Sequence, residues 1–546
     1  MRTSRLTDLD LWKQLKAHAE KMALPENHLK HLTMAPERLA EFSIQALDMV
    51  YDFSRQRVDR QAIDLLMELA WERKVTQRFQ AMTTGAVVNT TENRAALHTA
   101  CRDFSKAKRV VNKIDVTAEM ARVRKEIREF SEAVHAGQIT GATGKPFAHV
   151  VVVGIGGSYL GTEFVARALA AYADKGICLH FLANVDIHNF GEIAEAIDPE
   201  TTLWVIVSKS FTTAETMANA NQAAAFMKEQ GLDPARHFVS VTSKGSPGDQ
   251  TGQDAPFPVL RSFHMFDFIG GRYSVTSAVG GVPLSLYLGY DRFETFLKGA
   301  HQMDVHAATA PPTTNMPLTA ALLGIWNNNF LEYPAQAIIP YASPLARLAP
   351  HVQQLYMESN GKSVTAEGKP LGVRSGVIIF GEPGTNAQHS FFQLAHQGAP
   401  FPIDFIGVIK PQYDAFQALS RGVTNHQELW ANLISQPRAL AEGKESEDGH
   451  RSFSGNRPSS TILLEDLSPA SVGKLLAFYE ARTVYEAFVW GINPFDQYGV
   501  ELGKKLASEI RSQMAAKNRD AGHTFENVDS ISRFYLEKLM GKGNDE

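Results

Sequence analysis

The densest group of ligand-binding side chains in the sequence is a run of hydroxyls that begins at Ser208. The segment SKSFTTAET, residues 208–216, carries five hydroxyl side chains and one lysine. It directly follows residues 203–207, an apolar run typical of a buried strand. Capping of a helix needs one serine or threonine, so five hydroxyl side chains indicate that the segment does more than cap a helix. Because hydroxyls and the N–H groups of a helix start can hold an anion, the segment predicts a phosphate site.

A second candidate for phosphate binding is the glycine-rich turn GIGGSYLG at residues 154–161. It stands between a β-branched run and a helical pattern, where backbone N–H groups can face a phosphate. A dinucleotide-binding turn is the competing interpretation, but its spacing is GxGxxG, whereas this one is GxGGxxxG. A Walker-type loop is disfavoured because no Lys-Ser or Lys-Thr pair follows the glycines. A tight structural turn remains the simplest alternative.

Four further side chains could carry acid–base chemistry, although each is ambiguous alone. Arg272 stands in the segment GGRYS, and Glu358 stands in MESNGKS. His389 ends the segment GEPGTNAQH, and Lys504 ends FDQYGVELGK near the C-terminus. Taken singly, Arg272 is more often a structural ion pair, and Lys504 more often belongs to a solvated helix face. Position in the fold has to decide between these interpretations.

The elements that must position these residues follow a strand–helix–strand rhythm. Apolar runs typical of buried strands cover residues 149–153, 203–207 and 237–242, with helical patterns between them. The rhythm recurs at 376–380 and 404–409, separated by a helical segment at 387–398. It predicts an α/β fold with two tandem domains, each a mostly parallel sheet flanked by helices. The hydroxyl and glycine segments would then lie at the carboxyl edge of a sheet, where such folds bind ligands.

The remaining chain is expected to be largely helical. Residues 9–23 and 39–50 show helical periodicity without a clear strand signal, and residues 119–136 form an amphipathic pattern ended by Gly137. A polar stretch at 439–460 predicts a surface excursion, and helical spacing returns at 528–540. We expect a helical N-terminal arm (1–115), a first α/β domain (116–285), a second α/β domain (286–511) and a C-terminal helical tail (512–546).

Composition and charge are those of an ordinary soluble globular protein. The 546 residues are 44% hydrophobic, and 54 basic against 59 acidic residues give a net charge of −5. Nucleic-acid and anionic-membrane binders normally carry a basic excess, so we expect neither as a partner. The apolar runs are shorter than the ~20 residues of a membrane span, and charged residues interrupt the N-terminus where a secretion signal is apolar. We therefore expect a cytoplasmic location.

Cysteine and histidine usage bears on redox and metal chemistry. The only cysteines are Cys101 and Cys178, which excludes a disulfide framework and an all-cysteine metal site. No cluster of His, Cys and Asp has the spacing of metal ligands. We expect no metal ion and no cofactor.

Taken together, these segments closely resemble the glucose-6-phosphate isomerase (phosphoglucose isomerase) family. The matching stretches are VVVGIGGSYLG, VSKSFTTAET, GGRYS, MESNGKS, GEPGTNAQHSFFQLAHQG, GNRPSS and FDQYGVELGKKLA, in the family's order between residues 150 and 506. The resemblance implies two sugar-isomerase α/β domains and a homodimer whose active sites take residues from both subunits. It also implies an activity, the reversible isomerisation of glucose 6-phosphate and fructose 6-phosphate through ring opening and a cis-enediolate, in glycolysis and gluconeogenesis.

The same resemblance assigns roles to individual residues. The substrate-binding residues would be Gly157, Ser158, Ser208, Lys209, Ser210, Thr212, Thr213, Gln354 and Gln497. Glu358 would be the base, Arg272 the partner of the enediolate, and His389 and Lys504 the ring-opening groups. Three positions depart from the family pattern: Ser210, Ala387 and Tyr498 stand where threonine, glycine and tryptophan are common. None of these departures removes a group that the chemistry needs.

An aldose–ketose isomerisation needs groups of these kinds. One carboxylate that reaches both C1 and C2 can remove a proton from one carbon and return it to the other. The negative charge of the enediolate must be met where it develops, which a fixed guanidinium does. Cyclic sugars must open first, and an imidazole that titrates near neutral pH can exchange a proton with the ring oxygen.

Two other classes of function stay open at this point. A non-catalytic sugar-phosphate-binding regulator on the same fold would keep the hydroxyl segment but could lose Glu358 and His389, and both are present. A nicotinamide-dependent dehydrogenase is weakened by the glycine spacing. The structure of the glycine turn and a direct assay separate these alternatives.

Overall fold

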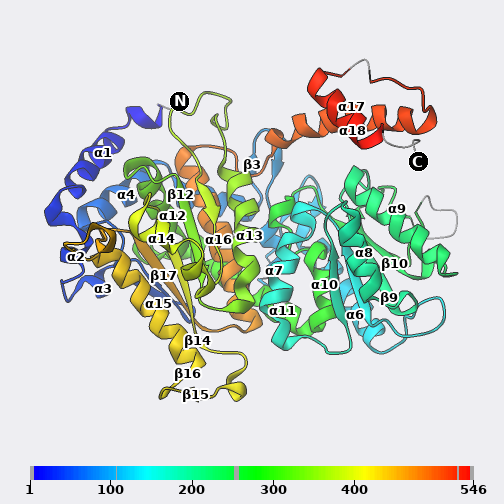
Figure 1. Ribbon diagram of the computed structural model, residues 1–546, viewed down its shortest axis with the longest axis horizontal. Coiled ribbons are helices and arrows are strands. Elements are labelled where there is room, and N and C mark those ends of the chain that lie inside the picture. The colour runs from blue at the N-terminus through cyan, green and yellow to red at the C-terminus, as the bar shows by residue number, and fades with distance from the viewer. Residues whose placement is uncertain (1–4, 106, 251–256, 526–527, 542–546) are drawn as a thin grey trace. The chain divides into compact units, whose positions relative to one another are not determined.

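The computed structural model describes residues 5–105, 107–250, 257–525 and 528–541. The chain forms two compact units, Met1–Phe495 and Asp496–Glu546. The first unit contains two largely parallel sheets with helices packed against them (Figure 1). The second unit contains the helices α17 (Glu501–Arg519) and α18 (Ser530–Met540).

The first sheet has five parallel strands in the order β11-β10-β9-β7-β8. Their bounds are β7 His149–Val153, β8 Cys178–Leu182, β9 Thr202–Val207, β10 Phe238–Ser243 and β11 Arg261–Met265. Side chains alternate across a strand, so Val150 and Val152 enter one hydrophobic core while Val151 and Val153 enter another. Burial on both faces explains why β7 and β9 are nearly continuous apolar runs.

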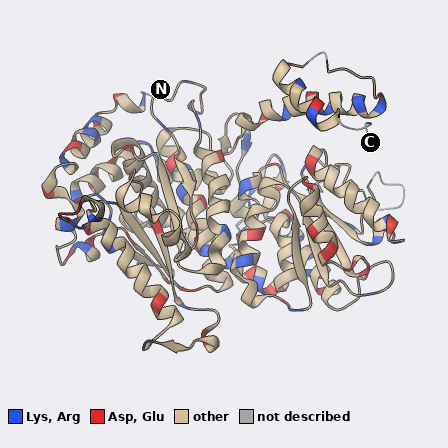
Figure 2. Ribbon diagram, viewed as in Figure 1, with Lys and Arg blue, Asp and Glu red and all other residues tan. Residues whose placement is uncertain are grey.

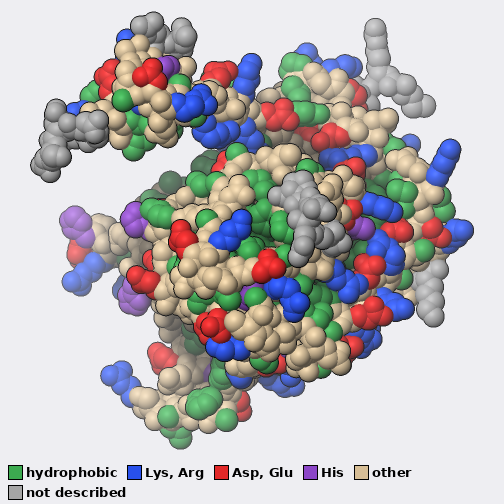
Figure 3. All heavy atoms as spheres, turned by 90° about the vertical axis from the view of Figure 1, so that its right-hand side faces the viewer, with side chains coloured by type: hydrophobic (Ala, Val, Ile, Leu, Met, Phe, Trp, Pro, Cys, Tyr) green, Lys and Arg blue, Asp and Glu red, His purple; other side chains and the backbone are tan. Residues whose placement is uncertain are grey.

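Helices cover both faces of this sheet. Their bounds are α6 Val116–His135, α7 Leu160–Ala168, α8 Ile187–Ala196, α9 Ala214–Glu229 and α10 Ala278–Leu288. The helix α6 starts where the Asp115 side chain accepts a hydrogen bond from the N–H of Ala118 and stops before Gly137, whose φ is +68°. The predicted helix at 119–136 is therefore confirmed. Figure 3 shows this half of the molecule, where acidic and basic side chains are interspersed.

The second sheet has six strands in the order β1-β2-β17-β14-β12-β13. Their bounds are β1 Ser43–Ala46, β2 Met49–Asp52, β12 Ala335–Pro340, β13 Ile378–Phe380, β14 Ile403–Lys410 and β17 Ser459–Asp466. The last four are parallel, whereas the hairpin β1–β2 runs antiparallel to β17. The helices α14 (Phe392–Gln397) and α15 (Asn425–Glu442) bury apolar side chains against one face. The predicted fold class, an α/β protein with two sheet-based domains, is confirmed; its domain boundaries stay predictions.

The helix α16 (Pro469–Trp490) runs through the interior of the second half and is buried along nearly its whole length. It nevertheless carries four charged residues, each paired with an opposite charge, and the first of them, Lys474, contacts Asp48 at 3.2 Å. Arg482 contacts Asp404 at 2.7 Å and Glu486 at 3.0 Å, and Glu480 contacts Arg102 at 2.6 Å. Buried charges are tolerated only when they are paired in this way. Burial raises the pKa of Glu480 to about 7 and that of Glu486 to about 6.

The prediction of a helical N-terminal arm is wrong in part. Residues 9–23 form α1 (Asp10–Met22) as expected. Residues 39–50 do not form one helix: they contain the end of the short helix α3 (Arg38–Glu41) and most of the hairpin β1–β2. The turn places Leu47 and Asp48 at φ values of +55° and +57°, the backbone of a tight hairpin. Neither is glycine or asparagine, and four-residue strands are too short to show a clear alternation. The hairpin therefore left no recognisable signal in the sequence.

Two further segments complete the comparison with the expected elements. The predicted helix at 387–398 is split into a 3-10 turn, Asn386–His389, and α14. The polar stretch at 439–460 includes the end of α15 and the first residues of β17, and the connection between them is exposed chiefly over residues 444–451, as a surface excursion should be. Figure 2 shows residues of both charge signs distributed over both halves.

The remaining elements are short ladders and packing helices. Their bounds are α2 Leu29–Leu32, α4 Arg60–Glu72, α5 Val75–Thr84, β3 Val87–Asn89, β4 Arg94–Ala95, β5 Val110–Val111, β6 Ile114–Asp115, α11 Tyr290–Thr309, α12 Met316–Ile325, α13 Leu348–Val352, β15 Leu419–Ser420 and β16 Val423–Thr424. Among the described residues, no helix is both long and apolar enough to cross a membrane.

Candidate active site

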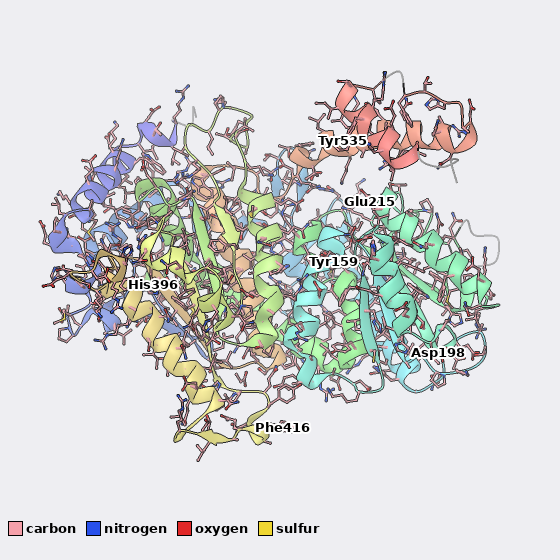
Figure 4. The ribbon with its side chains drawn as sticks, viewed as in Figure 1. Tyr159, Asp198, Glu215, His396, Phe416 and Tyr535 are labelled. Atoms are coloured by element: carbon pink, nitrogen blue, oxygen red, sulfur yellow. The ribbon has the colours of Figure 1, made fainter. Side chains whose placement is uncertain are left out.

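The hydroxyl segment and the glycine turn lie side by side at the carboxyl edge of the first sheet. Strands β7 and β9 are neighbours, with Val153 opposite Ile206. A Cβ placed on Gly154 would lie 3.3 Å from the Cβ of Val207. In Figure 4 the labels Tyr159 and Glu215, which belong to the glycine turn and the hydroxyl segment, mark this edge, and Asp198 marks the opposite edge. Ligand-binding segments in parallel sheets gather at this carboxyl edge.

The hydroxyl segment forms a loop that ends at the start of α9. The Ser210 Oγ lies 2.6 Å from the Thr212 Oγ1, and both residues are exposed. Thr213 occupies the N-cap position of α9, but its side chain makes no capping hydrogen bond. The first N–H groups of α9 are therefore not capped by a side chain, which leaves them available to an anion. This is the geometry that a phosphate site requires.

The base of the loop is buried and tightly held. Ser208 is only 2% exposed, and its Oγ has no hydrogen-bond partner within the described chain. Phe211 has a φ of +55°, a strained value for a non-glycine residue, and its ring packs into the core against Gly248. A buried hydroxyl without a partner is costly, so a ligand oxygen that reached Ser208 would be bound favourably.

The Lys209 side chain forms an ion pair with a residue of a neighbouring segment. Its Nζ lies 3.0 Å from the Asp267 Oδ1, just after β11. Burial lowers the pKa of the Lys209 ammonium, and the nearby Asp267 opposes that effect. The ion pair ties the loop to the segment that leads to Arg272.

The glycine turn packs directly against the segment that carries Arg272. A Cβ added to Gly157 would lie 2.2 Å from the carbonyl carbon of Gly271, so no other residue fits at Gly157 without displacing the backbone. The Ser274 hydroxyl donates to the carbonyls of Gly157 and Gly271, at 3.2 and 2.6 Å. Gly156 has a φ of +59° and lies beside the amide of Gln354. The glycines are thus explained by close backbone packing, without a dinucleotide.

Arg272 and Glu358 meet at the centre of the site. The Arg272 Nη1 lies 3.2 Å from the Glu358 Oε1. The rest of the guanidinium is fixed by protein groups: Nε donates to the Ser359 Oγ and Nη2 donates to the carbonyl of Pro494, both at 2.6 Å. The Tyr273 hydroxyl lies 2.9 Å from the same Ser359 Oγ. Arg272 is 3% exposed, so its charge acts in a largely water-free environment.

Glu358 is presented by an unusual helical turn. The helix α13 continues into a π-helical segment, Gln353–Glu358, which holds both Gln354 and Glu358. Such turns are rare and occur often at functional sites. Within it, Gln353 donates to the carbonyl of Ile379 at 3.0 Å. The carboxylate keeps 22% of its side-chain surface exposed, so a ligand can reach it.

Three predicted residues are not among those that contact this pair within the first unit. His389 ends the 3-10 turn Asn386–His389 and is exposed, and within the described chain no hydrogen bond or ion pair links it to Glu358 or Arg272. Gln497 and Lys504 belong to the second unit, where both are exposed. The residues gathered in the first unit are Gly157, Ser158, Ser208, Lys209, Ser210, Thr212, Thr213, Arg272, Gln354 and Glu358.

Three contributors to the site escaped prediction. Ser359, the Pro494 carbonyl and Asp267 all contact predicted residues. Ser359 stands next to Glu358 in a segment already singled out, and that adjacency was the only available signal. The carbonyl of Pro494 is 222 positions from Arg272, and no sequence pattern marks such a contact.

Comparisons with known proteins agree with this arrangement. The model of the phosphoglucose isomerase family matches residues 52–529. A cytosolic glucose-6-phosphate isomerase of Arabidopsis thaliana is 43% identical over 530 residues, which covers 94% of this chain and 93% of that protein. One of Spinacia oleracea is 41% identical over 559 residues, which covers 99% of this chain and 97% of that protein.

A solved structure supports the same conclusion. The crystal structure of a glucose-6-phosphate isomerase from Chlamydia trachomatis matches with a TM-score of 0.88 and 36% identity, over 98% of this chain and 99% of that one. The resemblance drawn from the motifs is thereby confirmed. The chain belongs to the phosphoglucose isomerase family.

Proposed function

We propose that this protein interconverts glucose 6-phosphate and fructose 6-phosphate, with Glu358 and Arg272 as the groups that act on the carbon chain. The observation that carries the proposal is the 3.2 Å contact between the Arg272 Nη1 and the Glu358 Oε1. It places a reachable carboxylate beside a buried, fixed guanidinium at the edge of the sheet that holds the hydroxyl loop. The relatives compared above are all named glucose-6-phosphate isomerases.

The carbon chemistry divides between these two side chains. The Glu358 carboxylate takes the proton from C2 of the open-chain aldose and returns it to C1. The resulting enediolate is stabilised by the Arg272 guanidinium. Because Ser359 and the Pro494 carbonyl already orient that guanidinium, little reorganisation is needed when the charge develops.

The phosphate group is the anchor that positions the reacting carbons. Ser208, Ser210, Thr212, Thr213 and the uncapped start of α9 supply hydroxyl and N–H donors at one place. The phosphate takes no part in bond changes, so the binding energy of this group serves to align C1 and C2 with Glu358.

Ring opening is assigned to His389 and Lys504, and Gln497 to the sugar hydroxyls. Their exposed positions support the expectation of a homodimer in which active sites take residues from both subunits. An exposed imidazole without a bond to its own Glu358 can complete the site of a second copy. The homodimer and these three roles are proposals that rest on the family pattern.

The competing functions receive less support. A regulator that only binds sugar phosphates has no need of a fixed guanidinium against a reachable carboxylate. A dehydrogenase would need the glycine turn for a dinucleotide, whereas Gly157 is required by its contact with Gly271. The plant relatives are named cytosolic, which supports the expected cytoplasmic location.

A coupled assay tests the activity directly. Purified protein supplied with fructose 6-phosphate should form glucose 6-phosphate, followed by a dehydrogenase that reduces a nicotinamide cofactor. The rate should be the same with EDTA, since none of the steps above uses a metal ion. Absence of turnover would refute the proposal, and reduction of NAD without the coupling enzyme would favour a dehydrogenase.

Removing hydroxyls from the loop should weaken both binding and turnover. In the double variant Ser210→Ala/Thr213→Ala, we expect KM to rise and kcat to fall, each by about tenfold, because a misplaced phosphate misaligns the carbons. Steady-state kinetics and inhibition by a phosphorylated sugar acid measure both effects. The exposed residues Ser420, in β15, and Thr313, between α11 and α12, provide a matched alanine control. Unchanged inhibition would place the phosphate elsewhere.

Replacing His389 should separate ring opening from proton transfer. His389→Ala should slow turnover of the cyclic sugar by about 10²-fold, the usual contribution of one acid–base group. An acyclic enediolate mimic, a phosphorylated hydroxamate, should bind with little loss because it needs no ring opening. Calorimetry with that mimic on both proteins provides the comparison. A loss of affinity as steep as the loss of turnover would show that His389 belongs to the enediolate site.

A further inference from the structure

A second cavity lies in the first unit, and no residue of the proposed active site lines it. Its volume is about 640 Å³, and its walls come from the ends of α4 and α5, the C-terminal end of α16 and the segment 365–371. Five cationic side chains and two carboxylates line it: Arg5, Arg73, Lys74, Arg78 and Lys369 against Glu72 and Glu367. The lining therefore carries an excess of positive charge within a chain whose net charge is −5.

Two of these cations are held rigidly against the end of α16. The Arg73 Nε donates to the carbonyl of Val489 at 3.0 Å, and the Arg78 Nη1 donates to the carbonyl of Phe488 at 2.8 Å. The Arg78 guanidinium also lies 4.3 Å from the centre of the Phe488 ring. These contacts satisfy the end of the helix and fix both guanidinium groups in place before any ligand arrives.

The two carboxylates offset only part of the positive charge of the cavity, since they face five cations. Across the described ranges, no carboxylate lies within 4.0 Å of a nitrogen of Arg73, Lys74, Arg78 or Lys369 in an ion pair. Burial lowers the pKa of Arg78 to about 10 and also lowers the pKa of Arg73. Arg73 and Arg78 are partly buried and form no ion pair among the described residues, so an anion that entered the cavity would be bound favourably.

The walls of the cavity are continuous with the two segments that hold Arg272 and Glu358. The segment 365–371 begins seven residues after Glu358, and the N–H of Ala366 donates to the carbonyl of Gly491 at 2.9 Å. Gly491 in turn lies three residues before Pro494, whose carbonyl orients Arg272. A ligand that drew these walls together would therefore move the segments that hold Glu358 and Arg272.

We propose that this cavity is an effector site for a compact polyanion that carries two or more phosphate groups. Guanidinium groups bind phosphate through paired N–H donors, and the two lysines add charge without a fixed direction. The volume lies within the range of small-molecule sites and admits a small phosphorylated metabolite, whereas a nucleic acid would need a longer basic surface. The site differs from the hydroxyl loop, which binds one phosphate mainly with neutral donors.

Calorimetry with inorganic pyrophosphate tests the binding. The protein is first saturated with fructose 6-phosphate, so that the active site is occupied. We expect one further binding event per chain, weakened at least tenfold in the double variant Lys74→Gln/Lys369→Gln. Both lysines are exposed, so these changes leave the core intact. The variant Lys125→Gln/Lys410→Gln removes the same charge from exposed positions elsewhere and should bind like wild type.

Kinetics tests the effector role, which rests on the proposed isomerase activity. Pyrophosphate should change kcat in wild type and in the control, and the change should be lost in Lys74→Gln/Lys369→Gln, whose basal activity is unchanged. No binding to the saturated protein, or equal binding by both double variants, would overturn the site. Binding at the site without any change in kcat would overturn the effector role, while leaving the proposed isomerase function untouched.

Discussion

Glu358→Gln is expected to lower isomerisation by about 10⁴-fold while sugar-phosphate binding changes little. General acid–base groups contribute about 10²–10⁴-fold, and here one carboxylate performs both proton transfers, so we expect the upper end of that range. The amide keeps the size of the side chain, and its oxygen can still accept a hydrogen bond from the Arg272 Nη1, which lies 3.2 Å from the carboxylate. What the amide cannot do is accept a proton from carbon.

Solvent deuterium exchange at C2 measures this step independently of product formation. In Glu358→Gln the exchange should disappear together with the coupled activity, while calorimetry with a phosphorylated sugar acid should give an affinity close to that of wild type. Glu129→Gln, an exposed position on α6, is the matched control and should be fully active. Exchange at the wild-type rate in Glu358→Gln would mean that another group is the base.

Four of the parallel strands, β7, β9, β10 and β14, were predictable because they are largely buried, whereas β12 and β17 of the second sheet were not predicted. The strands β7, β9 and β14 are apolar along most of their length, and an apolar run of that kind is rarely anything but a buried strand. The hairpin β1–β2 was not predictable, since its two strands have four residues each and its turn uses Leu47 and Asp48 rather than glycine. Its pairing with β17 joins residues about 400 positions apart. Tertiary contact, not local preference, decides such a strand.

In the candidate site, too, features set by the local sequence were predictable, and features set by contacts between distant residues were not. The hydroxyl loop follows its strand directly, so its position at the carboxyl edge could be derived from the sequence pattern alone. The orientation of Arg272 could not, because it depends on Ser359, 87 positions away, and on the Pro494 carbonyl. The π-helical turn that presents Glu358 also escaped prediction, since it differs from an α-helix by one residue in a turn.

Arg272→Lys should reduce kcat/KM by about 10²–10³-fold, the cost of losing one fixed donor to a developing oxyanion. The substitution keeps the charge, but an ammonium cannot donate in the three fixed directions of a planar guanidinium. Arg272 uses these directions for Ser359, the Pro494 carbonyl and Glu358. A lysine that keeps one of these contacts gives up the others, so its charge is no longer directed at the enediolate.

The affinity of an enediolate mimic distinguishes this loss from simple damage to the fold. A phosphorylated hydroxamate should bind Arg272→Lys weaker by nearly the same factor as kcat/KM falls, whereas a phosphorylated sugar alcohol, which carries no enediolate charge, should bind almost as in wild type. Arg347→Lys, at a partly exposed arginine paired with Glu163, is the control and should change neither affinity much. If both ligands lost affinity equally, Arg272 would serve general binding. If neither did while turnover fell, the guanidinium would act on another step, such as ring opening, because the charge of the enediolate would then be met elsewhere.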